Sequence, residues 1–216
     1  MTNSRKSEAT LLEQYRVALE NAINQPKIAA EMAELSYDAK KITEGQQLLS
    51  KTREMYDFNK QEDSETVEAS ALFKKEKETL NIQFKKHRKK AKAIFLKNPE
   101  ILKKINIDST VPYVYTNWIE NARQFYTQID RDILQQLAPL KITQQDITDS
   151  LAQIEIVEKA RAEYLREVGE SQDATKQKDA AIAKMNDWMQ KFYAIANIAL
   201  EEHPQLIEAL GKKRKS

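Results

Sequence analysis

The chain has 216 residues, 41% of them apolar and 31% charged, and its formal net charge of +2 implies no partner by itself. The absence of cysteine excludes disulfides, thiolate metal sites and cysteine nucleophiles. Three glycines are too few for phosphate-cradling loops or a doubly wound sheet, so the composition favours helices that bury one apolar stripe. Because there is no run of 18 apolar residues and no apolar signal segment, we expect a cytoplasmic protein without membrane contact.

Residues 1–7 are expected to form a frayed tail, after which the first helix begins. Apolar side chains recur with helical spacing over residues 11–35, which predicts one buried stripe. Pro26 lacks an amide hydrogen and clashes with the preceding turn, and we interpret it as a local bend within this region. The corresponding stripe in the second half, residues 118–137, contains no proline and is expected to run without a break.

Capping sequences predict where the next helix of each half begins. Thr43 stands three residues before Gln46, so each side chain can accept a hydrogen bond from the other residue's backbone amide. Thr143 and Asp146 form a weaker version of the same capping box. We therefore expect the second helix of each half to start at these two threonines.

Polar segments at residues 59–64 and 169–173 predict turns after these second helices. Gly169 suits the left-handed position that ends many helices. Beyond the turns we expect a long third helix in each half. The first of these runs from residue 64 to residue 97, or ~50 Å at 1.5 Å per residue, and the second is marked by an apolar stripe over residues 182–199.

Helix-start signals recur along the chain at a nearly constant interval. Pro99 and Pro204 are 105 residues apart, and each predicts a short closing helix with proline at its first position. The tripeptide Lys-Ile-Thr at residues 41–43 recurs 100 residues later, at residues 141–143. A fixed interval of this kind is typical of an internal repeat.

We therefore predict an all-α fold built from a duplicated antiparallel helical-bundle unit. Copy one spans residues 1–106 and copy two spans residues 107–216, each with three long helices and one short helix. Residues 106–112 are expected to link the copies, because residues 108–110 carry no apolar pattern and Pro112 resists helix continuation. The basic tail at residues 212–216 is expected to be disordered.

Neither histidine indicates a metal site. When the halves are compared, His87 aligns with the core position Phe192, and His203 aligns with the helix cap Asn98. The Glu-x-x-His pairs of dinuclear metal sites in helical bundles are absent. Methionines at helical spacing (Met185, Met189) are more typical of core filling than of haem ligation. We expect no metal and no cofactor, and no catalytic residues are predicted because neither a triad nor a nucleophile elbow is present.

Aromatic residues are concentrated in the second half of the chain. Trp188 and Tyr193 align with Gln83 and Arg88, so the second half carries apolar surface that the first half does not need. One interpretation is a larger core or packing between the two units. The other is a groove for a partner helix or an apolar ligand.

Positive charge is concentrated in one predicted helix region. Residues 74–104 hold twelve Lys or Arg against three acids, whereas residues 179–209, at the equivalent place in copy two, hold two basic and five acidic residues. A basic helical face can neutralise the phosphates of nucleic acid or of anionic lipid, although a lysine run is often only a solvated face. The candidate anion or nucleic-acid contacts are Lys85, Lys86, Arg88, Lys89, Lys90 and Lys92.

Three functional hypotheses follow from these features. The first is a non-enzymatic interaction or structural protein that binds a protein partner, or itself, through helix faces. The alternative is an electrostatic binder of nucleic acid that uses the basic helix at residues 74–104. The third is an enzyme with an unrecognised carboxylate site.

Overall fold

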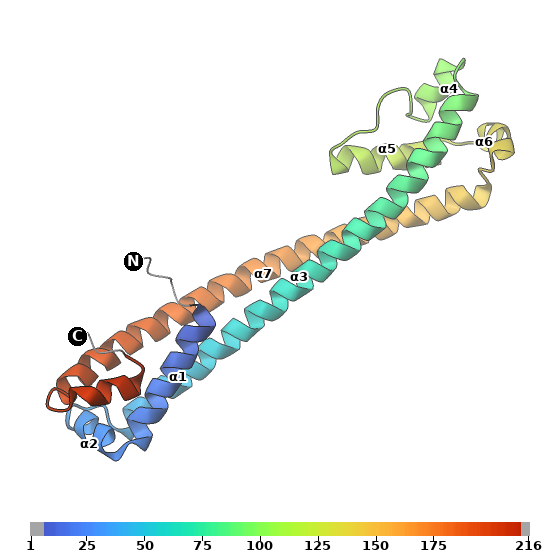
Figure 1. The fold of residues 1–216 in the computed structure, drawn as a ribbon. Coiled ribbons are helices and arrows are strands. Elements are labelled where there is room, and N and C mark those ends of the chain that lie inside the picture. Colours follow the sequence, from blue (N-terminus) through green and yellow to red (C-terminus); the bar gives the residue numbers. More distant parts are fainter. Residues whose placement is uncertain (1–6, 213–216) are drawn as a thin grey trace. The chain divides into compact units, whose positions relative to one another are not determined.

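The computed structural model describes residues 7–212, which form helices and connecting segments with no strand among them (Figure 1). The all-α prediction is therefore confirmed. The predicted tails lie outside the described residues, apart from Ser7, which caps the first helix, and Lys212. In chain order the elements are α1 (Glu8–Asn24), α2 (Pro26–Glu34), α3 (Ala39–Ile94), α4 (Pro99–Lys104), α5 (Tyr115–Thr127), α6 (Arg131–Leu137), the 3-10 helix η1 (Ala138–Leu140), α7 (Gln144–Ala199) and the 3-10 helix η2 (Pro204–Leu210).

The chain divides into two compact units. Unit 1 combines residues 1–63 with residues 170–216, and unit 2 consists of residues 64–169. Each unit therefore draws on both halves of the sequence. Unit 1 holds α1, α2, the first part of α3, the last part of α7, and η2, while unit 2 holds the remaining parts of α3 and α7 with α4, α5, α6 and η1.

Both predicted polar turns are wrong, because α3 and α7 continue through residues 59–64 and 169–173 as unbroken helices of 56 residues each. Most polar side chains at these places lie on the exposed faces of the two helices, and only Asn59 and Glu62 are buried. In unit 1, Asn59 is buried and its amide donates a hydrogen bond to the Thr175 hydroxyl over 3.1 Å. Gly169 is helical and exposed, so it is an interior residue of α7 and not its end.

Only one of the two predicted capping boxes forms. Thr143 precedes α7 and exchanges hydrogen bonds with Asp146: each backbone amide donates to the other side chain, over 2.7 and 3.2 Å. Thr43 instead lies inside α3, where its hydroxyl donates back to the Ala39 carbonyl. The side chain of Asp38 accepts from the Lys41 amide at the true start of α3, because an aspartate outside the helix satisfies the unpaired first-turn amide equally well.

The stripe over residues 118–137 is interrupted, which corrects the prediction of a continuous helix. α5 ends at Thr127, and Asp130 caps α6 by accepting a hydrogen bond from the Ile133 amide over 2.9 Å. A capping aspartate therefore breaks the helix where the first half uses Pro26, which is the first residue of α2. Pro26 begins the second of two consecutive helices of unit 1, which agrees with its interpretation as a local bend within this region.

Each unit has its own apolar core. In unit 1, the core unites α1, α2, α3, α7 and η2, and its fully buried side chains include Leu19, Ile28, Ile42, Met189 and Phe192. In unit 2, α3 packs with α5, α6 and α7, and the fully buried side chains include Leu80, Phe84, Phe125, Leu137 and Ile154. Burial of these residues supplies most of the driving force for folding, at about 1.5–3 kcal/mol for each large side chain.

Candidate functional site

The six predicted basic residues fall into two groups within unit 2. Lys85, Lys86 and Lys89 are exposed and form no hydrogen bond or ion pair with any described residue. We call these three residues the exposed lysine face. Arg88, Lys90 and Lys92 instead donate to backbone carbonyls of the unit itself. The six residues thus lie on one helix, but only three of them are exposed and without a hydrogen-bond partner among the described residues.

Arg88 and Lys92 tie the segment after α4 to α3. A guanidinium nitrogen of Arg88 and the ammonium of Lys92 both donate to the carbonyl of Ser109, the latter over 3.2 Å. Arg88 is only 5% exposed, and burial lowers the pKa of its guanidinium, an effect that the charge of Asp108 opposes. These two cations therefore stabilise the local fold of unit 2.

Lys90 has a similar internal role at the other side of the helix. Its ammonium donates to the Leu140 carbonyl over 2.6 Å and approaches the Lys141 carbonyl at 3.5 Å. This bond satisfies the end of η1, whose last carbonyls have no helical partner. Lys90 is accordingly a structural residue of unit 2.

A groove of about 630 Å³ lies beside the same helix in unit 2. One side is formed by α3 and the other by the segment that precedes α5, where the ring of Tyr113 is 98% exposed. Trp118 contributes to the lining although it is only 3% exposed, and the Lys77 ammonium lies 5.5 Å from the centroid of its ring. The lining residues are Lys74, Lys77, Glu78, Asn81, Lys85, Val111, Pro112, Tyr113 and Trp118.

Sequence reasoning missed this groove, although it had singled out some of its residues. Lys74, Lys77 and Lys85 belong to the basic region, and the spacing of 3 and 8 residues places them on one side of α3. Tyr113 follows Pro112 in the expected linker, so an aromatic residue in a polar segment was the available signal. The opposite wall could not be inferred because it depends on how residues 107–114 fold back along α3.

The two histidines lie where packing and capping predict them. His87 is buried in unit 2, with its Nδ1 3.2 Å from the hydroxyl of Tyr126, and burial is the main cause of its lowered pKa. His203 precedes η2 at the capping position, but its side chain forms no capping hydrogen bond. Met185 and Met189 are fully buried in the core of unit 1.

Trp188 and Tyr193, which the sequence comparison singled out, belong to the core of unit 1. Trp188 stacks on Phe192 with ring centroids 5.7 Å apart, and the buried Tyr193 donates to the Leu210 carbonyl over 3.1 Å. The indole of Trp188 lies so close to Gly45 that a methyl group added there would come within 2.7 Å of Cζ2. These contacts agree with the prediction of a larger core.

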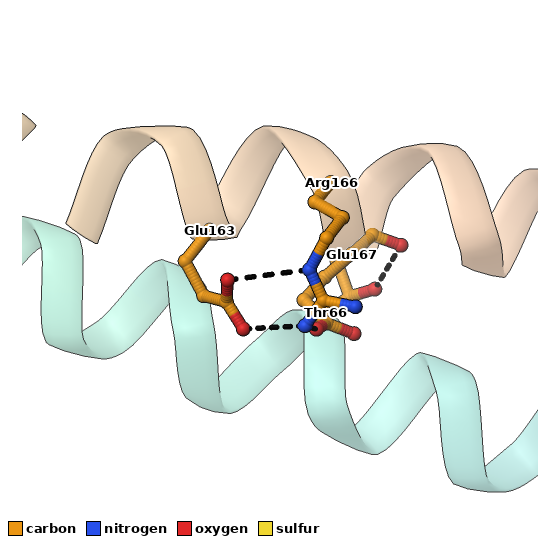
Figure 2. A network of polar contacts seen from close by, with 4 residues as sticks. All are labelled: Thr66, Glu163, Arg166 and Glu167. Atoms are coloured by element: carbon orange, nitrogen blue, oxygen red, sulfur yellow. Dashed lines mark hydrogen bonds and ion pairs between the residues drawn. The ribbon is translucent and has the colours of Figure 1, made fainter. Parts of the chain in front are cut away.

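A polar network joins the two long helices within unit 2 (Figure 2). The Thr66 hydroxyl of α3 donates to the Glu167 carbonyl of α7 over 3.1 Å. Arg166 forms ion pairs with the side chains of Glu163 and Glu167, and its hydrogen bond lowers the pKa of the Glu163 carboxyl. Every charge shown there has an opposite charge beside it, in contrast to the exposed lysine face.

Two further hollows have a more apolar lining. In unit 1, a groove of about 400 Å³ runs between α1 and α3, with leucines at Leu12, Leu19 and Leu49 and charged residues of both signs around them. In unit 2, Leu72 and Ile156 are 48% and 45% exposed beside a shallow hollow of about 360 Å³. Neither hollow combines apolar surface with one dominant sign of charge.

No helix among residues 7–212 is both long and apolar enough to cross a membrane. Comparisons of the chain with protein-family models, with curated proteins and with solved structures found no match.

Proposed function

We propose that this chain is a non-enzymatic binding protein whose ligand is nucleic acid, bound at the exposed lysine face of α3. The observation that carries the proposal is that Lys85, Lys86 and Lys89 are exposed and have no acidic partner among the described residues. Three like charges within about one helical turn repel one another, so the arrangement is unfavourable for the helix alone. Phosphate groups would relieve this repulsion and release their own counterions.

The second half of the chain supports the same proposal. The residues 105 positions after the exposed lysine face are Gln190, Lys191 and Ala194, so only one of the three equivalent positions is charged. α7 reaches the same length without the other two lysines. The additional positive charge is therefore better explained by a ligand than by helix formation.

A gel-retardation assay with oligothymidine and with a mixed-sequence duplex, at about 50 mM salt, tests the proposal. We expect the wild-type protein to retard nucleic acid and the triple variant Lys85→Glu, Lys86→Glu, Lys89→Glu to retard none. Substitution of Lys40, Lys51 and Lys184, three exposed lysines of unit 1, by glutamate makes the same change of net charge and should leave retardation intact. Absence of retardation by the wild type, or equal loss in both variants, would refute the proposal.

We also infer that the halves 1–106 and 107–216 are copies of one ancestral unit. The inference is supported by the interval of 105 residues between the starts of α2 and α6, of α3 and α7, and of α4 and η2. Buried positions follow the same interval, as in the pairs Leu80 with Met185 and Ile28 with Ile133. An experimental structure in which Pro99 and Pro204 lie in unlike surroundings would contradict the inference.

A protein partner bound through helix faces is the second candidate function. It is favoured by the exposure of Leu72 and Ile156 beside the shallow hollow of unit 2. If this hollow mediates self-association, light scattering should show an oligomer in the wild type and a monomer in Leu72→Glu. A wild-type monomer at all concentrations would exclude self-association through this surface.

A further inference from the structure

We infer that the groove beside α3 in unit 2 binds single-stranded nucleic acid, with Tyr113 stacked on an unpaired base and lysines facing the phosphates. This inference rests on the proposed function and adds the strandedness of the ligand and the residue that selects it. It is carried by the combination of an exposed aromatic ring, a line of lysines and a groove between them.

Tyr113 is exposed although the segment that carries it is anchored. Ser109 is held to α3 through its carbonyl by Arg88 and Lys92, and Val111 packs against the core of unit 2. The ring of Tyr113 is nevertheless 98% exposed, so it contributes almost nothing to the burial of apolar surface. An aromatic side chain placed in this way on a fixed backbone is suited to stacking with a ligand, because little conformational freedom is lost on binding.

The opposite wall of the groove supplies the positive charge. Lys74, Lys77 and Lys85 line it, and the eleven helical steps from the first to the last of them span ~16 Å at 1.5 Å per residue. Glu78 is the one acid among the lining residues. The Lys77 ammonium lies over Trp118 at a distance typical of a cation–π contact, which holds it at the floor of the groove. The lysines thus form a line along which a phosphate backbone can run.

The geometry favours a single strand over a duplex. In a duplex the base faces are stacked on one another, and a side chain can reach only their edges in the grooves. Tyr113 can stack on a base only when that base is unpaired, and a groove of about 630 Å³ has the size of a small-ligand pocket and not of a double helix. Aromatic platforms beside basic grooves are the general means by which proteins bind single strands without reading their sequence.

Fluorescence anisotropy with labelled oligothymidine, oligouridine and a mixed-sequence duplex tests the inference. We expect Tyr113→Ala to weaken the binding of single strands by about 5- to 150-fold, the loss of one base stack, and Tyr113→Phe to retain it. The salt dependence of binding should stay unchanged in Tyr113→Ala because the phosphate contacts remain. The matched control is Phe58→Ala, which removes a partly exposed aromatic ring of unit 1 and should have no effect.

The outcomes separate this inference from the function on which it rests. If single strands bind, and reversal of the exposed lysine face abolishes binding, but Tyr113→Ala binds as tightly as the wild type, the stacking inference is wrong while the proposed function stands. The stacking inference would also be wrong if the duplex bound more tightly than either single-stranded oligonucleotide. If the wild type binds none of the three probes, both proposals fail. Circular dichroism should show equal helical content in all variants, because Tyr113 is exposed.

Discussion

At equivalent positions, 105 residues apart in the sequence, each unit has a buried side chain that donates a hydrogen bond to a backbone carbonyl, but the two side chains differ. In unit 2, Arg88 of α3 donates to the carbonyl of Ser109; in unit 1, Tyr193 of α7, 105 residues later, donates to the carbonyl of Leu210. Both side chains are buried and both fasten the segment at or beyond the closing helix. What the fold requires at this position is therefore a buried hydrogen-bond donor, and a positive charge is only one way to provide it.

The neighbouring positions differ in a way that the fold does not explain. Lys85 and Lys89 of unit 2 correspond to Gln190 and Ala194 of unit 1, which carry no charge. Lys90 corresponds to Ile195, a partly buried residue that packs against the core of unit 1. The comparison teaches that a basic run contains both structural and free cations, and that only their hydrogen-bond partners distinguish them.

The largest expected effect concerns the two helix glycines. Gly45→Ala should lower the free energy of unfolding by about 1–3 kcal/mol, because the added methyl group has to displace the Trp188 indole. Gly169→Ala should raise it by about 0.8–1 kcal/mol, since alanine is the better helix former and nothing beyond the adjacent residues and the local helix backbone lies within 4 Å of the new methyl group. Urea denaturation of the two variants measures both changes.

If the free energy of unfolding falls in Gly45→Ala and rises in Gly169→Ala, the results support both the Gly45–Trp188 contact and the continuity of α7 through residue 169. If Gly169→Ala proved destabilising, the glycine would need a left-handed conformation, and the originally predicted turn at residues 169–173 would be restored.

The free energy of unfolding should depend on pH through His87, whereas phenylalanine, the residue at the equivalent position 192, cannot titrate. Burial lowers the pKa of His87 from its ordinary value of 6.5, with Lys90 and Lys86 acting in the same direction and Asp146 against it. The unfolded chain then binds a proton that the folded protein resists, so the free energy of unfolding should be highest above about pH 6.5 and should decrease as the pH falls below it.

His87→Phe, which installs the residue that unit 1 carries at this position, should reduce this decrease between pH 7 and pH 5, a window set by the ordinary histidine pKa of about 6.5. Denaturation of both proteins across that window provides the measurement. An identical pH dependence would show that His87 is protonated equally in both states.

The smallest effects are expected at the exposed lysine face. Replacement of Lys85, Lys86 or Lys89 by glutamine should change the free energy of unfolding by less than about 0.5 kcal/mol each, as for other surface positions. Lys90→Gln should cost more, about 0.5–1.5 kcal/mol, because the partly buried hydrogen bond to the Leu140 carbonyl is lost. If all four substitutions lowered the free energy of unfolding by comparable amounts, all four lysines would contribute to the stability of unit 2.

Much of the helical framework could be predicted from the sequence, because its signals are local. Proline marks the starts of α4 and η2, a threonine and an aspartate cap α7, and the apolar period places His87 in the core. The predicted turn at residues 59–64 is wrong because polar residues also occupy the faces of a continuous helix. Asn59 is polar and buried since its partner, Thr175, lies 116 residues away in the sequence, which no local pattern indicates.

The candidate site was only partly predictable for the same reason. The basic residues were evident, but the division between free and bonded cations depends on distant carbonyls such as that of Leu140, 50 residues beyond Lys90. The groove forms because the segment that contains Ser109 and Tyr113 lies against α3. The sequence pattern alone does not indicate the path of this segment. Charge density indicates a region, while tertiary contacts decide which of its residues can bind a ligand.

The salt dependence of oligothymidine binding tests the central claim most directly. Each phosphate neutralised on a single strand contributes about 0.7 to the slope of log affinity against log salt concentration. For the glutamine variant of Lys85, Lys86 and Lys89, we expect a slope about 2 smaller in magnitude than that of the wild type. A wild-type protein that binds with the same slope as this variant would contradict it, because the exposed lysine face would then contact no phosphate.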